Sequence, residues 1–106
     1  MGRKRQIVLQ NAEPGDEGLE SLGTLAEVTS MLARFNTAPD GRPSKTGTDI
    51  LHGPGFVLEL PRGLSRLTQA MVTVEEEDFA FPVLSRACKA LGWVMVDIES
   101  GRRFGG

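Results

Sequence analysis

The residue types that could support chemistry gather in one segment, residues 37–55, which is rich in glycine and proline. It contains Lys45, Asp49 and His52, the last being the only histidine of the chain. Glycine-rich loops that carry Ser, Thr and Lys can bind an anion through backbone N–H groups, although the G-x-x-x-x-G-K-[ST] spacing of a P-loop is absent here. One hypothesis is therefore a small ligand-binding or enzyme domain with these three residues as its site; a mobile loop and a partner-binding loop are the alternatives.

Catalytic and metal chemistry find few other candidates. A Ser or Cys nucleophile needs a base, and His52 is the only imidazole. The only cysteine, Cys88, lies on the apolar stripe of an expected helix, which favours an inert buried thiol. One histidine and one cysteine on different elements do not make a zinc site, and the acidic run 75–78 lacks the ligand spacing of an EF-hand loop. We therefore predict no catalytic residue, no metal and no cofactor, and an enzymatic activity is left open.

The composition restricts the classes of partner. The chain has 12 basic and 14 acidic residues and a net charge of −2, which gives no argument for nucleic acid. It has no tyrosine, and the aromatic pattern of an RNA-recognition sheet is missing. No apolar run approaches the ~18 residues of a membrane span, and a single cysteine cannot form an internal disulfide, which suits a reducing compartment. We expect a cytoplasmic protein that does not bind a membrane, and nucleic-acid binding through Arg3–Arg5 and Arg102–Arg103 is a less favoured alternative.

The densest apolar pattern lies in the last third of the chain and predicts a strand, a helix and a second strand. Alternating side chains in Ala70–Val74 indicate the first strand. Asp78 is a plausible N-cap for a helix over Ala80–Leu91, and Gly92 is expected to end that helix in the left-handed conformation. The apolar run that follows, within 93–98, predicts a strand in the interior of a sheet.

The rest of the chain supplies a second helix and two more strands. Residues 22–36 show apolar side chains at helical spacing, and Thr24 with Glu27 matches a capping box at the start. Residues 56–60 alternate between apolar and other side chains, as a half-buried strand does. Residues 6–10 form a weaker candidate for the first strand; if they were only a tail, the sheet would keep three strands.

At 106 residues we expect one domain with two loose ends. The basic residues around Arg5 predict a flexible N-terminal tail over residues 1–5. Residues 37–55 are expected to be a long loop, and residues 101–106 a C-terminal tail. Phe104 either packs back onto the domain or belongs to a disordered tail.

The predicted element order is that of an α+β two-layer sandwich with the ferredoxin-like βαββαβ pattern, in which an antiparallel sheet carries both helices on one face. The helices would cover the sheet face that carries Phe56. The opposite face would carry Val57, Met71, Trp93 and Met95. A bare apolar face of this kind usually marks a partner. We therefore predict a non-enzymatic protein-binding or assembly module that uses its open sheet face, as a homodimer or with another protein.

Overall fold

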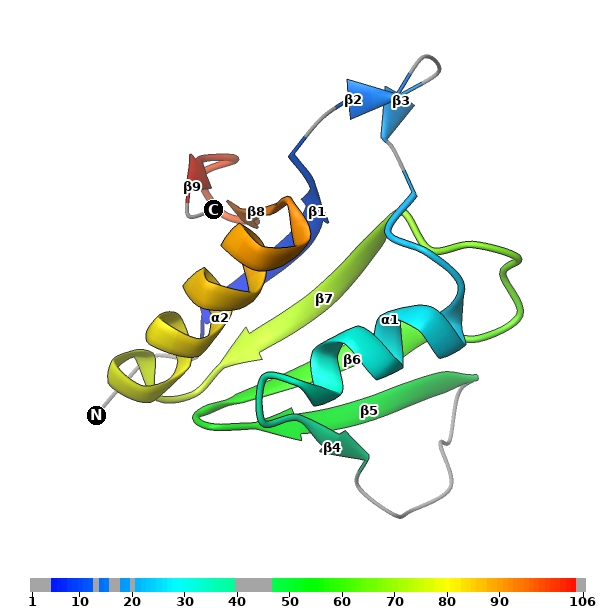
Figure 1. Cartoon of the computed structure of the whole chain (residues 1–106). Helices are drawn as coiled ribbons and strands as arrows, with labels where there is room; N and C mark the ends of the chain where they lie inside the picture. Colours follow the sequence, from blue (N-terminus) through cyan, green and yellow to red (C-terminus); the bar gives the residue numbers. More distant parts are fainter. Residues whose placement is uncertain (1–4, 13, 16–17, 20, 40–46, 105–106) are drawn as a thin grey trace.

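A sheet of seven antiparallel strands forms one layer of the molecule, and two helices form the other (Figure 1). The computed structural model describes residues 5–12, 14–15, 18–19, 21–39 and 47–104. The strands of the sheet are β1 (Arg5–Asn11), β4 (Ala38–Pro39), β5 (Thr48–Gly53), β6 (Phe56–Pro61), β7 (Gln69–Val74), β8 (Trp93–Asp97) and β9 (Arg103–Phe104). The helices are α1 (Leu25–Ala33) and α2 (Glu77–Leu91), and a separate two-stranded ribbon consists of β2 (Pro14–Gly15) and β3 (Gly18–Leu19). The predicted α+β class is confirmed.

The strand order places β1 among the central strands of the sheet. Across the sheet the order is β4-β5-β6-β7-β1-β8-β9, and every neighbouring pair is antiparallel. The four strands predicted from the sequence are the neighbours β6, β7, β1 and β8. The predicted βαββαβ element order is not matched, because β4 and β5 intervene between α1 and β6, and β9 follows β8. The tail predicted over residues 1–5 is wrong for Arg5, which belongs to β1, and residues 1–4 lie outside the described residues.

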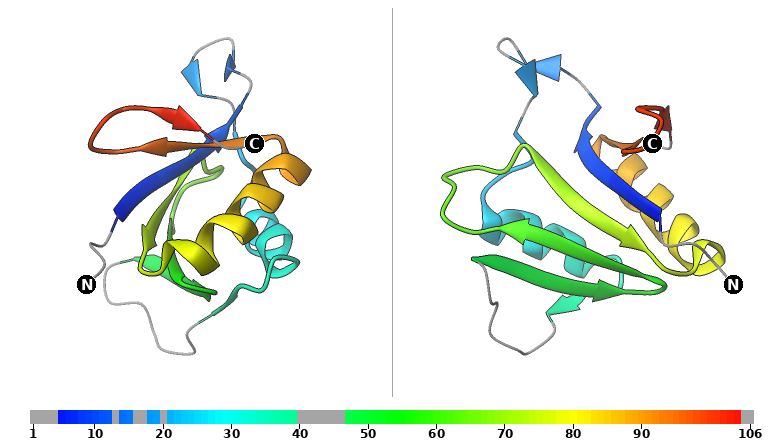
Figure 2. Two further views of the ribbon diagram at one scale, coloured as in Figure 1. Left: turned by 90° about the vertical axis from the view of Figure 1, so that its left-hand side faces the viewer. Right: turned by 180° about the vertical axis from the view of Figure 1, so that it is seen from behind.

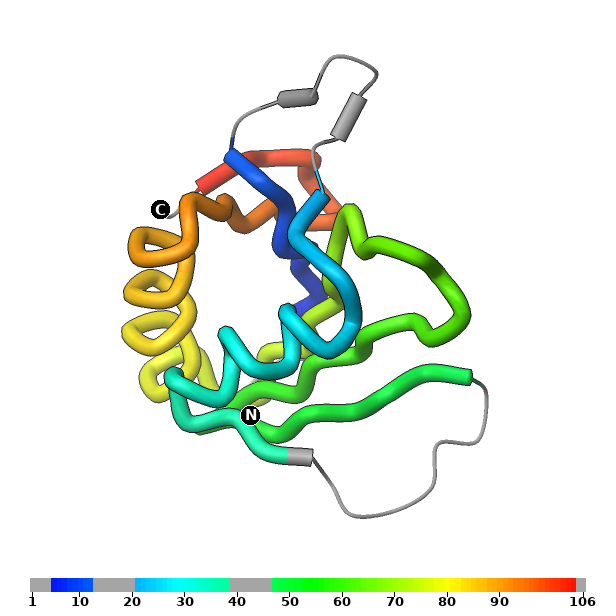
Figure 3. The backbone as a smooth tube through the Cα atoms, turned by 45° about the vertical axis from the view of Figure 1, so that its right-hand side comes forward, coloured from blue at the N-terminus to red at the C-terminus, as the bar shows by residue number. Residues whose placement is uncertain are grey.

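Both helices lie on the same face of the sheet. Figure 2 shows α1 and α2 on one side of the strands and the other face bare of helices. The sheet is strongly twisted and curls toward the helices, as a sheet that buries one face commonly does. In Figure 3 the helices and the strands surround a common interior, which the core side chains fill. The face turned away from the helices is called the open face below.

The core consists of alternate residues from the central strands and the inner stripes of the helices. Its most deeply buried large side chains include Ile7, Leu9, Leu32, Leu51, Phe56, Leu58, Leu60 and Leu84. The alternation predicted for β6 and β7 is confirmed, because Phe56, Leu58 and Leu60 are buried in one strand and Ala70, Val72 and Val74 in the other. At ~25 cal/mol per Å² of apolar surface removed from water, this layer is the main source of stability.

The side chains of β8 point to the opposite faces of the sheet from those predicted. Trp93 and Met95 are only 2% and 1% exposed and belong to the core, whereas Val94 and Val96 face away from it. The register explains the result: Met95 lies opposite the core residue Leu9 of β1, and directly opposite residues of an antiparallel pair share a face. The long side chains of Trp93 and Met95 thus fill the space beneath α2.

The segment 37–55 was predicted as a long loop, and this prediction is wrong for its described residues. Residues 48–53 form β5, which pairs along its whole length with β6. The two strands are joined by Pro54 and Gly55, and the φ of +76° at Gly55 is the value that a type II turn requires at its third position. Lys45 lies outside the described residues.

The capping box predicted for Thr24 and Glu27 is present, and α1 begins at Leu25 rather than at residue 22. The hydroxyl of Thr24 accepts from the backbone N–H of Glu27 over 3.2 Å, and the carboxylate of Glu27 accepts from the N–H of Thr24 over 2.9 Å. Both hydrogen bonds of a capping box are therefore present. The helix is shorter than predicted, because it ends at Ala33 and the chain then reverses through Asn36, whose φ is +62°.

Helix α2 starts at Glu77, and its N-cap residue is Glu76 rather than Asp78. The side chain of Glu76 makes no capping hydrogen bond. Instead, the carbonyl oxygen of Gly55 accepts from the N–H groups of Glu75 and Glu76 over 2.7 and 3.0 Å, so that the β5–β6 turn fixes the chain where the helix begins. At the other end Gly92 has φ +74°, and its left-handed conformation ends the helix as predicted.

The chain after β8 returns to the sheet. Arg103 and Phe104 form β9 opposite Val96 and Met95. The ring of Phe104 meets the ring of Phe81 of α2 edge to face, with 5.8 Å between their centroids. Of the two alternatives for Phe104, packing onto the domain is therefore the one that occurs.

Candidate functional site

One row of side chains crosses the open face from β5 to β9. The register places each member directly opposite the next, and the row consists of Ile50, Glu59, Met71, Val8, Val96 and Arg103. Directly opposite side chains in antiparallel strands lie ~5 Å apart. The row is therefore continuous, with apolar members in the middle and one charged residue on either side of them.

The three strands in the middle of the open face carry no charge there. Their side chains on this face are Gln69, Met71 and Thr73 from β7, Gln6, Val8 and Gln10 from β1, and Val94 and Val96 from β8. Glu59 of β6 and Arg103 of β9 lie beyond them on opposite sides, and both are exposed. An uncharged centre with a charged rim is the arrangement found at protein interfaces.

The predicted interface residues divide into two pairs. Val57 and Met71 lie on the open face and are half-buried, so their predicted role stays a prediction. Trp93 and Met95 lie in the core, and their placement on the open face was wrong. The apolar open-face residues that the sequence analysis missed are Val8, Val94 and Val96, and the pairing of β1 with β7 and β8 places Val8 and Val96 beside Met71.

The predicted ligand residues are not brought together within the described residues. Asp49 lies opposite Leu60, and its Oδ1 forms an ion pair with Nε of Arg62 at 2.9 Å. His52 lies opposite Val57 and is exposed on the open face. Because successive side chains of a strand alternate between faces, residues three positions apart on β5 point to opposite sides of the sheet.

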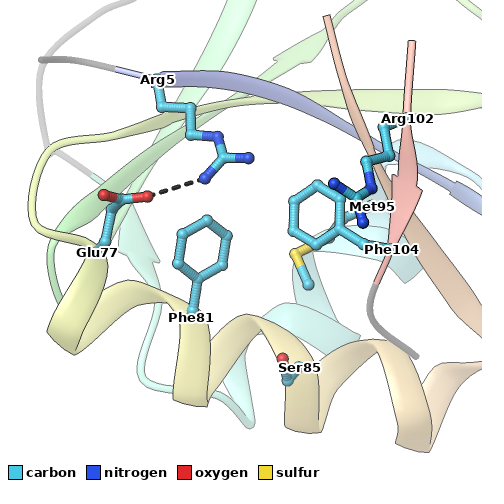
Figure 4. Close-up of a pocket in the computed structure, with 7 residues that line it drawn as sticks. All are labelled: Arg5, Glu77, Phe81, Ser85, Met95, Arg102 and Phe104. Carbon is cyan, nitrogen blue, oxygen red and sulfur yellow. Dashed lines mark hydrogen bonds and ion pairs between the residues drawn. The ribbon is translucent and has the colours of Figure 1, made fainter. Parts of the chain in front are cut away.

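A hollow of about 550 Å³ lies between α2 and the strands β1, β8 and β9 (Figure 4). Its wall consists of Arg5, Glu77, Phe81, Ser85, Met95, Arg102 and Phe104. In Figure 4 the guanidinium group of Arg5 points into the space between the rings of Phe81 and Phe104. The carbon Cζ of Arg5 lies 5.5 Å from one ring centroid and 5.4 Å from the other, which is the range of cation–π contacts.

Two carboxylates neutralise Arg5 in this hollow. Nε of Arg5 donates to Oδ2 of Asp97 over 2.8 Å, and Nη1 donates to Oε1 of Glu77 over 2.9 Å. These bonds raise the pKa of Arg5, with the Asp97 bond contributing most. The same bond lowers the pKa of Asp97, assisted by the backbone N–H groups of Ser100 and Glu99. A carboxylate held ionised in this way is unsuited to act as a general acid, so the cluster joins structural elements rather than forming an acid–base pair.

The chain gave no match to a protein-family model, to a curated protein or to a solved structure. Among the residues that the structure describes, no group of three or more His, Cys, Asp or Glu side chains could hold a metal ion. Within the same residues, neither helix is long and apolar enough to cross a membrane. Cys88 is buried, as predicted, and burial raises the pKa of its thiol to about 12.

Proposed function

We propose that this protein is a binding module that associates with a protein surface through the open face of its sheet. The observation that carries the proposal is the row across this face, in which Met71, Val8 and Val96 are direct neighbours on three adjacent strands; Met71 and Val96 are half-buried, and Val8 between them is 8% exposed. Val57 extends the apolar area onto β6. The helices leave this face uncovered, as the views in Figure 2 illustrate.

The size of the open face agrees with a reversible interaction. Four strands of about 20 Å length at about 4.8 Å spacing, with the two-residue strand β9 beside them, give a footprint of about 400 Å². Two such faces in contact would bury about 800 Å² in total, which is below the ~1,200 Å² at which stable complexes begin and in the range of weak, transient ones. The polar side chains of Gln6, Gln10 and Thr73 keep the free face compatible with water.

The charges around the face favour specificity over indiscriminate adhesion. Glu59 and Arg103 flank the uncharged strands with opposite signs. A partner must present matching charges at both positions, because an unmatched charge at an interface loses water without gaining a counter-charge.

Photo-crosslinking tests the proposal directly. A photoreactive phenylalanine analogue replaces Gln6, which is exposed on the central strand of the open face, or in a matched control Arg86, which is exposed on α2. We expect irradiation of the purified protein and of the cells that make it to give a protein adduct from position 6 and none from position 86. Absence of any adduct from position 6, or equal adducts from both positions, contradicts the proposal.

A further inference from the structure

We propose, on the basis of the function proposed above, that the protein surface bound by the open face is the open face of a second copy. In this dimer a two-fold axis runs along β1 between the two sheets, so that the two β1 strands lie over each other in parallel and Val8 meets Val8 of the second copy. The face is self-complementary about this axis in its apolar residues, its amides and its charges. β1 lies between β7 and β8 in the sheet, and in Figure 2 no helix covers the face of these strands that is turned away from α1 and α2.

Residues on a two-fold axis meet their own copies, so the proposed dimer requires that no charged residue lies on the axis. A charged side chain there would face an identical charge and repel it. The open-face residues of β1 are Gln6, Val8 and Gln10, and none is charged. A glutamine amide carries both donors and an acceptor, so that two copies of one glutamine can hydrogen-bond to each other.

Off the axis, each residue meets the residue that lies equally far on the other side of β1. Met71 on β7 would meet Val96 of the second copy, because both lie one strand from β1 in the same row. Glu59 on β6 and Arg103 on β9 each lie two strands from β1, in that row. Glu59 would therefore meet Arg103 of the second copy, and the symmetry would form this ion pair twice.

The pair cannot form within one chain. Glu59 and Arg103 are separated by four strand spacings, or about 19 Å at the usual distance between strands. Their only route to each other is across an interface between copies. Because the sheet curls away from the open face, two copies would be closest along β1 and farther apart at the flanks, where the long side chains of Glu59 and Arg103 can span the gap.

Arg103 is held loosely in the single chain. Its Nη2 donates to the carbonyl oxygen of Ala12 over 3.2 Å, and both residues are exposed. A carboxylate is a stronger acceptor for a guanidinium group than a neutral carbonyl, since the hydrogen bond is then charge-assisted. We therefore expect Arg103 to gain a stronger hydrogen bond when it leaves Ala12 and binds Glu59 of the second copy.

Sedimentation velocity over a range of protein concentrations measures the dimer constant for the wild type and for charge-reversal variants. We expect a reversible dimer whose Kd rises about tenfold in Glu59→Arg and in Arg103→Glu, because each change turns two attractions into repulsions. The double variant restores both pairs with exchanged signs, so we expect its Kd to return to near the wild-type value. Arg86→Glu, which makes the same charge change on α2, should leave the Kd unchanged.

The outcomes separate this inference from the proposed function. The proposed dimer is wrong if the protein is a monomer at every concentration. It is also wrong if the Kd of the double variant is as high as that of the single variants. If the protein is monomeric while position 6 crosslinks to a different protein, the dimer is wrong and the proposed function stands. If position 6 gives no adduct and the protein is monomeric, both fail. The charged residues are exposed, so circular dichroism is expected to show that all four variants are folded.

Discussion

Arg5 and Asp97 are separated by 92 positions in the chain, yet Nε of Arg5 donates to Oδ2 of Asp97 over 2.8 Å. This bond connects the beginning of β1 to the end of β8. The other oxygen of Asp97 accepts from the N–H groups of Glu99 and Ser100 over 2.9 and 3.2 Å, so that the same carboxylate also shapes the turn toward β9. One side chain thus links β1 to β8 and shapes the turn that leads from β8 to β9.

We expect Asp97→Asn to destabilise the protein at neutral pH and to lose this effect in acid. Hydrogen bonds from Arg5 hold the folded-state pKa of Asp97 below its ordinary value. The carboxylate therefore contributes stability above about pH 4, the usual range of an unfolded Asp, and this contribution is lost as pH falls through the lower folded-state pKa. Urea unfolding of both proteins between pH 7 and pH 3 checks this. A constant difference between them over that range would contradict the role given to the charge.

The turn between β5 and β6 supplies a second prediction. Gly55 has φ +76°, and a Cβ at this position would lie 2.6 Å from the carbonyl oxygen of Glu76. We expect Gly55→Ala to lower the free energy of unfolding by about 1–2 kcal/mol for the left-handed backbone and by about 1–3 kcal/mol more for the forced contact. Gly63→Ala is the matched control, because Gly63 has φ +87° with open space around it and should show the backbone cost alone. Equal losses in the two variants, measured by urea unfolding, would exclude the contact as a cause.

Features set by neighbouring residues could be predicted from the sequence. The capping box of Thr24 and Glu27 needs only the spacing of two side chains, and it forms as expected. Gly92 ends α2 because glycine adopts the left-handed conformation without steric cost. The alternation of β6 could be read directly, because the exposed Glu59 lies between buried leucines and marks the outer face.

Features set by distant residues were missed. The many glycines and prolines of residues 37–55 led to the prediction of a loop, and β5 was missed. Pro54-Gly55 directly before the alternating strand β6 is nevertheless a recognisable hairpin signal. The run from Trp93 to Val96 is apolar throughout, so no polar residue indicates its outer face. Its facing follows from the register with β1, and the same register aligns Val8 with Met71 and Val96. The open-face row therefore could not be predicted without the strand pairing.

The reversed facing of β8 can be checked with Trp93, the only tryptophan. Its side chain is 2% exposed, so we expect blue-shifted fluorescence and little quenching by acrylamide in the folded protein. Denaturant should shift the emission to the red and make quenching efficient. A Val57→Trp variant in a Trp93→Phe background provides the comparison, because Val57 is half-buried on the open face and should be quenched more readily. Ready quenching of native Trp93 would show that the facing predicted from the sequence was right after all.

The thiol of Cys88 provides the last prediction. Burial in the core raises its pKa to about 12, and only the thiolate reacts with disulfide reagents. At pH 8 a group with this pKa is ionised to a fraction of about 10⁻⁴, whereas an ordinary thiol of pKa ~8.5 is ionised to about a quarter. We therefore expect native Cys88 to react with an aromatic disulfide reagent at least a thousandfold more slowly than in denaturant. A Cys88→Ala, Arg86→Cys variant moves the thiol to an exposed position of the same helix and should react rapidly while folded. Equally rapid labelling of native Cys88 would mean that the interior beneath α2 opens far more often than a packed core allows.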